Sequence, residues 1–320
     1  MAHNRFEKFA WGFLFYLIAV ILFGAWVRIT HSGAGCGSHW PTCQGEIVPI
    51  APSINTIIEF THRLTSGLCG VFGLMMVFWA WRLERSGPMF LASAATLFFV
   101  LVEGAIGAGL VLKELVADDD SVARAIVVAL HLSNTLLLTA SATLAAWLAG
   151  GHILPRPPSN DPFTRRFALA VALLILTSMT GAVTALGDTL FPIEPTWGPG
   201  LIDKVGAGLS TANHFLVRLR AVHPAVAIFA GLYVCWLVVP LVREGGNRWA
   251  KAALHLTLTE LALGALNVLL AAPGWLQIIH LLLAHSLWVT LLLTALSRDR
   301  EGAVARDHDN LPLTRATQTP

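Results

Sequence analysis

The strongest constraint on the fold of this chain is a series of eight apolar stretches, each near the roughly 20 residues that a membrane-spanning helix needs. Charged residues make up only 12% of the sequence, against about 25% in a typical soluble domain. Strands of a membrane barrel would instead show short segments of alternating polarity. The sequence therefore predicts an all-α integral membrane protein. The eight expected transmembrane helices cover residues 10–28, 56–80, 89–112, 122–149, 166–187, 213–241, 250–271 and 274–296.

The basic residues predict the orientation of these helices, because cytoplasmic connections are enriched in Lys and Arg. Most of the 21 Lys and Arg residues fall near the two termini and in every second connection. We therefore expect a multi-pass protein of the cytoplasmic membrane of a bacterium or archaeon, with both termini in the cytoplasm. The first segment carries no cleavage site and is expected to be a retained helix. No basic run with interleaved aromatic residues suggests a nucleic-acid partner.

The chain shows signs of an internal duplication. The segments "VEGAIGAGLVL" and "TELALGALNVLL" share the form E-x-x-x-G, which superposes Glu103 on Glu260 and Gly107 on Gly264. We expect two pseudo-symmetric four-helix bundles, related by an axis along the membrane normal. The predicted units are an N-terminal half (1–151, with an outer loop at 29–55), a cytoplasmic linker (152–165), a C-terminal half (166–298) and a disordered cytoplasmic tail (299–320).

Each even-numbered predicted helix carries a histidine at a similar depth, about 9 to 15 Å below the outer membrane boundary at 1.5 Å per residue. Ionisable groups at such depths usually face the bundle interior and serve a function. A single histidine of this kind is more often a hydrogen-bonded packing residue, but four at matching depth indicate ligands. Paired imidazoles on facing helices are what axial ligation of a haem iron requires. The predicted iron ligands are His62, His131, His223 and His280.

Two alternatives to this ligand set are a zinc site and a different histidine in the last helix. Zinc would need Cys or carboxylate ligands close to the histidines, and no predicted helix shows such close His and Cys spacing. The last helix also contains His285, five residues after His280. The two side chains cannot share a helix face, and the register with His131 favours His280.

An acidic residue, Glu59, lies three residues before His62 on the same helix face. It is either a structural partner that orients an imidazole or caps the helix, or an acid that moves protons during chemistry at the porphyrin edge. Arg220 stands at the corresponding position of the second half. This asymmetry suggests that one haem is chemically altered and the other is kept. Together with Arg63 and Arg218, Arg220 lies near the outer boundary, where arginines bind haem propionates or reach lipid headgroups.

Two cysteines, Cys36 and Cys43, lie in the first outer loop, on the oxidising side of the membrane, where a disulfide bond is favoured. Two roles remain open for this pair. The disulfide either clamps a lid over the adjacent site, or exchanges electrons or disulfides with a partner.

Four segments of the chain carry a resemblance to a known family. "GAGCGSHWPTCQG", "IIEFTHRLTSG", "RAVHP" and "QIIHLLLAHSLW" resemble signature segments of haem A synthases, and the likeness extends over about residues 10–298. The resemblance implies oxidation of a ring methyl group of haem O to a formyl group by successive hydroxylations, giving haem A for terminal oxidases. Some members carry a second cysteine pair in the third outer loop. This chain lacks that pair, so a mechanism that needs both pairs cannot operate in it.

The same resemblance implies roles for individual residues. His62 and His131 match the ligands of the substrate haem, and His223 and His280 match those of a resident haem b. Glu59 matches the glutamate of the family's second helix. We further expect His62 or His131 to leave the iron during turnover, because a six-coordinate iron is closed to oxygen.

Two other function classes are compatible with histidine-bound haems. The chain would then be a di-haem b-type electron carrier, or a haem transporter or chaperone. Ligands that all lie in the outer layer argue against electron transfer across the membrane, and a transporter needs no acid beside a ligand. For the enzyme, the expected partners are haem O and haem A, an unidentified electron donor, a farnesyl-transfer enzyme that supplies haem O, the lipid bilayer and a second copy of the chain.

Overall fold

The structure is a computed structural model that describes residues 2–155, 161–193, 198–245 and 247–309. Within these ranges the chain forms helices and contains no β-strand. Eight helical segments are long and apolar enough to cross a membrane, which confirms the predicted multi-pass membrane protein. The long helices are α1 (Ala2–Ile29), α2 (Ile54–Leu83), α3 (Pro88–Leu112), α4 (Val122–Ala149), α5 (Pro162–Leu190), α8 (Val222–Arg243), α9 (Arg248–Leu269) and α10 (Gly274–Asp309).

Two short helices, α6 (Leu201–Gly208) and α7 (Phe215–Leu219), lie in the connection between α5 and α8. The sixth predicted segment is therefore divided, with α7 forming its first turn and α8 the remainder. Pro224 explains the break, because it has no N–H group to bond the carbonyl of Arg220. The sequence pattern did not predict α6, which is short and follows a glycine-rich turn.

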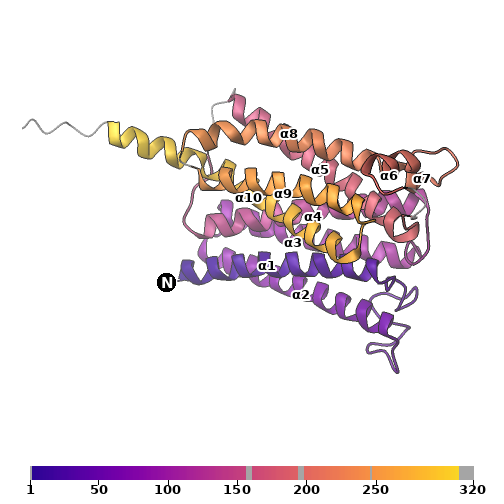
Figure 1. The fold of residues 1–320 in the computed structure, drawn as a ribbon. Coiled ribbons are helices and arrows are strands. Elements are labelled where there is room, and N and C mark those ends of the chain that lie inside the picture. Colours follow the sequence, from indigo (N-terminus) through magenta and orange to yellow (C-terminus); the bar gives the residue numbers. More distant parts are fainter. Residues whose placement is uncertain (1, 156–160, 194–197, 246, 310–320) are drawn as a thin grey trace, which may run out of the picture.

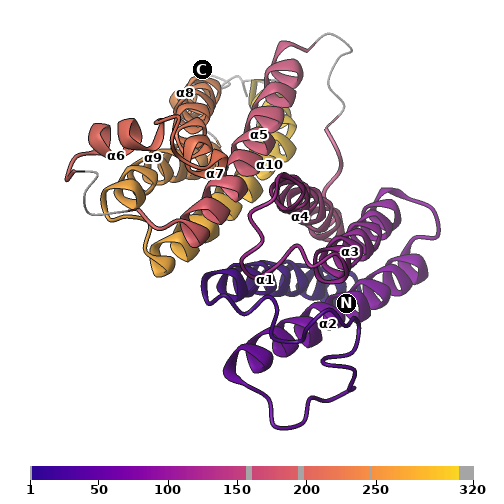
Figure 2. The same ribbon diagram turned by 90° about the vertical axis from the view of Figure 1, so that its right-hand side faces the viewer.

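The long helices run side by side, and the connections that contain α6 and α7 lie at the same end of the molecule as the loop before α2 (Figure 1). Viewed along the helices, α1–α4 gather on one side and α5–α10 on the other (Figure 2). We call these two groups the first half and the second half. The end that carries these connections and the loop before α2 is called the outer end, following the predicted orientation.

Each half has its own apolar core. In the first half it is built from residues such as Phe6, Met76 and Leu138, and in the second from residues such as Val234 and Leu291. Both cores lie toward the end opposite the outer loops. Small residues along α4 allow its neighbours to approach closely, as is typical of membrane helices. The tight packing at one end leaves room for a cavity between the helices at the outer end.

The C-terminal boundary differs from the predicted one. The helix α10 continues to Asp309, past residue 299, where the sequence predicted the start of a disordered tail. Arg, Glu and Ala in this stretch are good helix formers, so the polar composition does not end the helix. Residues 310–320 lie outside the described residues, as does the central part of the predicted linker, 156–160.

Candidate functional site

A large cavity of about 1830 Å³ lies between the helices and is lined by residues from both halves. Pockets for single small molecules usually measure about 300 to 1,000 Å³, so this cavity has room for more than one ligand. The four predicted iron ligands, His62, His131, His223 and His280, all line it. Sequence reasoning placed them at one depth, and the folded chain turns them toward one space.

The two histidines of the second half lie opposite each other across the cavity. The ring centres of His223 and His280 are 6.4 Å apart, with the ring planes at 78°. A transition metal bonds an imidazole nitrogen at about 2 Å, so two imidazoles on opposite sides of one iron have ring centres roughly 6 Å apart. The spacing of this pair fits a haem iron between the rings.

Both histidines of this pair are anchored through Nδ1. The Nδ1 atom of His280 lies 3.0 Å from Glu260 Oε2 on α9. The Nδ1 atom of His223 lies 3.1 Å from the carbonyl oxygen of Thr177 and 3.2 Å from Thr180 Oγ1, both on α5. A partner at Nδ1 fixes the ring orientation and leaves Nε2 as the nitrogen that binds a metal.

In the first half, His131 is anchored in the same way, with its Nδ1 atom 3.2 Å from Glu103 Oε1 on α3. Glu103 also accepts hydrogen bonds of 2.6 Å from the side chains of Thr135 and Asn134. The E-x-x-x-G repeats thus each supply a carboxylate to the histidine of the following helix. Sequence analysis superposed Glu103 on Glu260 but assigned neither a role at the site.

The remaining predicted ligand, His62, is held differently. Among the described residues, the buried Nδ1 atoms of His62, His131 and His280 all lack a well-aligned hydrogen bond, but His131 and His280 each face a carboxylate, whereas His62 does not. The ring instead packs edge-on against Phe23 of α1, with ring centres 5.4 Å apart. Phe23 precedes Gly24, as Thr180 precedes Gly181, and each glycine faces the nearby imidazole: an added Cβ atom would lie 3.2 Å from His62 and 3.0 Å from His223. These glycines let α1 and α5 approach the rings closely.

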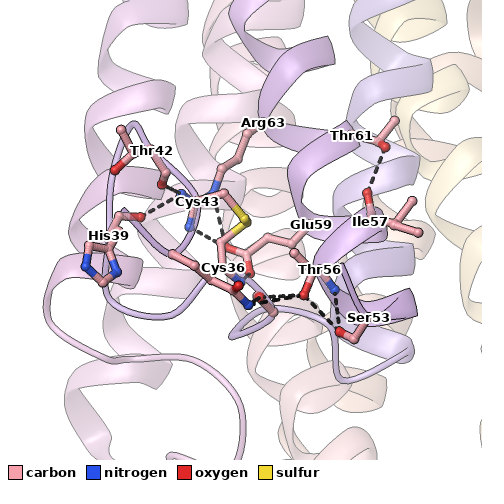
Figure 3. Close-up of a disulfide and its surroundings, with 12 residues drawn as sticks. Cys36, His39, Thr42, Cys43, Ser53, Thr56, Ile57, Glu59, Thr61 and Arg63 are labelled. Carbon is pink, nitrogen blue, oxygen red and sulfur yellow. Dashed lines mark hydrogen bonds and ion pairs between the residues drawn. A yellow bond between two sulfur atoms is a disulfide. The ribbon is translucent and has the colours of Figure 1, made fainter. Parts of the chain in front are cut away.

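Glu59 joins α2 to the first outer loop (Figure 3). It is only 3% exposed, and its Oε2 atom accepts a hydrogen bond of 2.8 Å from the Cys36 amide. Its Oε1 atom forms an ion pair of 2.5 Å with Arg63. Arg63 in turn donates to the carbonyl oxygens of His39 and Thr42, at 2.6 and 2.7 Å. The buried ion pair therefore holds the loop onto α2.

The loop itself covers part of the cavity. Cys36 and Cys43 form the predicted disulfide bond, and Trp40, Pro41 and Thr42 between them line the cavity. Gly35 is required for this packing, because a Cβ atom there would lie 2.4 Å from the backbone oxygen of Asn55. The disulfide therefore braces a segment that forms one wall of the site.

The predicted propionate-binding arginines have different surroundings. Arg63 and Arg220 line the cavity, whereas Arg218 is exposed and is not among the lining residues. The Nε atom of Arg220 is 2.8 Å from Asp188 Oδ1 on α5, and its Nη2 atom donates to the carbonyl oxygens of Gly187, at 2.6 Å, and of Phe191. In the second half, the position that corresponds to Glu59 is thus occupied by Arg220, which forms an ion pair with Asp188.

Arg28 is a further cavity-lining cation that the sequence analysis did not select. It extends from α1 into the second half, where it donates to the carbonyl oxygen of Ala185 at 2.6 Å, to Thr189, and to Gln277 Oε1 at 2.9 Å. Its place at the end of an apolar helix resembled that of an ordinary headgroup-binding arginine, so no sequence signal distinguished it.

The competing histidine on α10, His285, is only 1% exposed and its Nδ1 atom lies 2.9 Å from the carbonyl oxygen of Leu281. It does not line the cavity, whereas His280 does. Among the described residues, no three His, Cys, Asp or Glu side chains converge as a structural zinc site requires.

Comparison with known proteins adds a family to this geometry. Residues 7–292 match the family described as "COX15-CtaA: Cytochrome oxidase assembly protein". A "Protoheme IX farnesyltransferase" of Thermus thermophilus is 42% identical over 311 residues, which cover 94% of this chain but 50% of that protein. This chain therefore spans about half the length of that relative.

Two further relatives are similar to the chain over most of both lengths. A "Heme A synthase" of Halalkalibacterium halodurans is 29% identical over 301 residues, covering 90% of this chain and 95% of that protein. A "Heme A synthase" of Symbiobacterium thermophilum is 29% identical over 296 residues, covering 86% and 89%.

Proposed function

The chain belongs to the COX15-CtaA family of cytochrome oxidase assembly proteins, and from that premise we propose that it converts haem O to haem A. In this reaction a ring methyl group is hydroxylated twice, and the product loses water to leave a formyl group. The Halalkalibacterium and Symbiobacterium relatives carry the name of this activity. The observation that carries the proposal is one cavity with two histidine pairs that are anchored unequally.

The second-half pair is proposed to hold the resident haem b. The ring spacing of His223 and His280 fits two ligands of one iron, and each ring is oriented through its Nδ1 atom. When bound, this haem supplies electron-transfer chemistry, since ligation on both faces leaves no position for oxygen. The protein's part is to fix both rings.

The first-half pair is proposed to hold the substrate, haem O, between His62 and His131. Both histidines line the cavity. An imidazole with no partner at Nδ1 is held less firmly than one with a hydrogen-bonded partner. His62 is therefore the ligand that we propose leaves the substrate during turnover, opening one face of it.

Glu59 is proposed to act through the outer loop. Both of its oxygens are engaged, with the Cys36 amide and with Arg63, which supports a positioning role for the wall that covers the substrate. The sequence-based alternative, proton transfer at the porphyrin edge, requires Glu59 to release one of these partners.

The membrane arrangement extends the proposal. Paired contacts in the two halves, from glycine to imidazole and from imidazole to carboxylate, support a duplicated four-helix unit. The distribution of basic residues supports cytoplasmic termini in the cytoplasmic membrane, which puts the disulfide loop on the oxidising side. An electron donor, a supplier of haem O and self-association complete the proposed set of partners.

Extraction of the bound porphyrins tests the function directly. The chain is expressed in a host that makes haem O but not haem A, and the extracts are analysed by mass spectrometry. We expect hydroxymethyl and formyl haems, and their absence in cells that contain the His62→Ala variant. Recovery of unmodified haem alone from the wild-type chain would favour an electron carrier or a haem chaperone.

The name of the Thermus relative motivates a second candidate, farnesyl transfer to haem. This chain matches only half of that protein, so the name can describe the half that has no counterpart here. The same extraction separates the two activities in a host that makes only haem b. Farnesyl transfer would yield haem O there, whereas a haem A synthase would leave haem b unchanged.

A further inference from the structure

The wall of the cavity between α2 and α3 is apolar and loosely packed. Leu64 of α2 and Leu101 of α3 line the cavity, and the two residues are 55% and 62% exposed. We call this junction of the two helices the α2–α3 seam.

Glycines keep this seam open. Four of them line the cavity along α2 and α3: Gly67, Gly70, Gly104 and Gly107. A Cβ atom added at any of these positions would meet no neighbouring side chain within 4 Å, so close helix packing does not explain them. Farther from the outer end the helices touch, because a Cβ atom at Gly73 would lie 3.1 Å from Leu97. The seam thus widens toward the outer end, where the histidines lie.

The corresponding junction of the second half carries larger side chains, which also line the cavity. With the histidines superposed, Ile228 stands at the position of Gly67; with the glutamates superposed, Leu261 stands at the position of Gly104. The side chain of Leu261 reaches to 3.0 Å from a Cβ atom built on Gly231, and Gly231 is buried. A leucine therefore closes in one half the gap that a glycine leaves in the other.

We propose that the α2–α3 seam binds the isoprenoid tail of the haem substrate. This inference rests on the proposed function, because haem O differs from haem b by a long hydrocarbon chain. A porphyrin between His62 and His131 needs an apolar place for that chain, and the glycines of the seam leave such a place beside this pair. The resident haem b has no such chain, and Leu261 packs onto Gly231 at the corresponding place in its half.

Binding of two haems to matched variants tests the seam. The chain that already contains haem b in its second half is titrated with haem O or with further haem b, and the absorption change gives each Kd. In Gly104→Leu, which reproduces Leu261, we expect about tenfold weaker binding of haem O, equivalent to unburying about two methylene groups. Binding of haem b is expected to be unchanged, because the porphyrin pocket is intact.

The matched control is Gly12→Leu. Gly12 of α1 also faces open space but does not line the cavity, so this variant is expected to bind both haems as the wild type does. The absorption spectrum of the second-half haem reports folding in every variant. Gly67→Ile, which reproduces Ile228, provides an independent test should Gly104→Leu fail to fold.

Two results would overturn the inference. If Gly104→Leu weakens the binding of haem O and haem b equally, the seam belongs to the porphyrin pocket. If it weakens the binding of neither, the isoprenoid tail does not bind in the seam, which would then contact a lipid acyl chain. The proposed function fails on a different measurement, the absence of oxidised haem in extracts of the wild type. Selective loss of haem O binding in Gly104→Leu would stand even in that case.

Discussion

Each half of the bundle contains two of the four cavity histidines. One histidine of each half has similar surroundings, and the other does not. His131 and His280 each face a carboxylate on the preceding helix. His223 has two oxygen partners on α5, whereas His62 packs against Phe23 and its Nδ1 atom has no partner among the described residues. Corresponding histidines of the two halves thus differ in the groups that orient their rings, which is the basis of the proposal that one half keeps its haem and the other releases it.

The seam and the ion pairs extend this contrast. The first half has glycines facing open space at the α2–α3 seam and carries a disulfide-braced loop, whereas in the second half Leu261 packs onto Gly231. Glu59 holds a loop through Arg63, while Arg220 is held by Asp188 of its own half. The glycines and the lone imidazole of His62 leave the first half less tightly packed around its histidines, while the disulfide and the Glu59 ion pair fix the loop that covers them.

The largest expected effect comes from removing a ligand in each half. His62→Ala is expected to abolish formyl haem while the chain still purifies with haem b, whereas His223→Ala is expected to lose haem b itself. The reason is that each variant removes one of two iron ligands from a different site. Haem content by pyridine haemochrome assay and product by mass spectrometry provide the two readouts. Loss of haem b in both variants would break the comparison.

The next largest effect concerns Glu59. Glu59→Ala removes the acceptor of the Cys36 amide and the ion-pair partner of half-buried Arg63. Hydrogen bonds to a charged group are worth about 1.5 to 3 kcal/mol, so the loop should loosen and haem A production should fall to a trace. Glu59→Gln keeps an acceptor for the Cys36 amide without the charge. Partial activity of Glu59→Gln, measured by haem A yield with loop proteolysis in parallel, is expected for a positioning role. An inactive Gln variant with an intact loop would instead indicate proton transfer.

Exchange of the residues beside Gly24 and Gly181 tests the unequal anchoring. Thr180→Val removes one hydrogen bond, worth about 1 kcal/mol, so haem b should leave for an apomyoglobin acceptor several-fold faster. Phe23→Thr offers His62 the missing partner and should tighten substrate binding while slowing turnover. Phe23→Leu serves as control, because it changes the packing without adding a hydroxyl. Equal haem-transfer rates for Thr180→Val and the wild type would remove Thr180 from the argument.

A smaller effect is expected for the cysteine pair. The double variant Cys36→Ser/Cys43→Ser loses a short loop closure worth about 2 to 3 kcal/mol, so the loop should be cleaved faster by protease. The ion pair of Glu59 still holds it, and haem A production should fall only in part. If the double variant makes no product at any assay temperature, the result would favour a redox role of the cysteine pair over a purely structural one.

The smallest effect lies far from the site, at the start of α5. Asp161 accepts a hydrogen bond of 2.8 Å from Arg298, which with Thr164 holds the pKa of Asp161 well below its usual range. A lowered folded-state pKa stabilises the fold above about pH 4 and loses that contribution as pH falls. Asp161→Asn should lower Tm by at most a few degrees at pH 7, with no difference from wild type in acid.

Much of the fold was readable from the sequence, because lipid requires long uninterrupted apolar helices and leaves little choice of architecture. Seven of the eight predicted segments lie within four residues of the observed spans, whereas the first begins seven residues too late, at residue 10. The four cavity histidines were selected by depth and repetition. The break at Pro224 and the short α6 were missed, since tertiary packing at the outer end decides them.

The sequence by itself determined the number of membrane-spanning helices, the four histidines that line the cavity and the cysteine pair, because each follows from spacing along one chain. Only the tertiary structure decided which atoms meet across helices: Glu103 with His131, Phe23 with His62, and Leu261 with Gly231. Such contacts depend on how far two helices approach and rotate, which no single periodicity records. The two halves therefore differ in how their helices pack around the histidines, and not in the number of histidines that they carry.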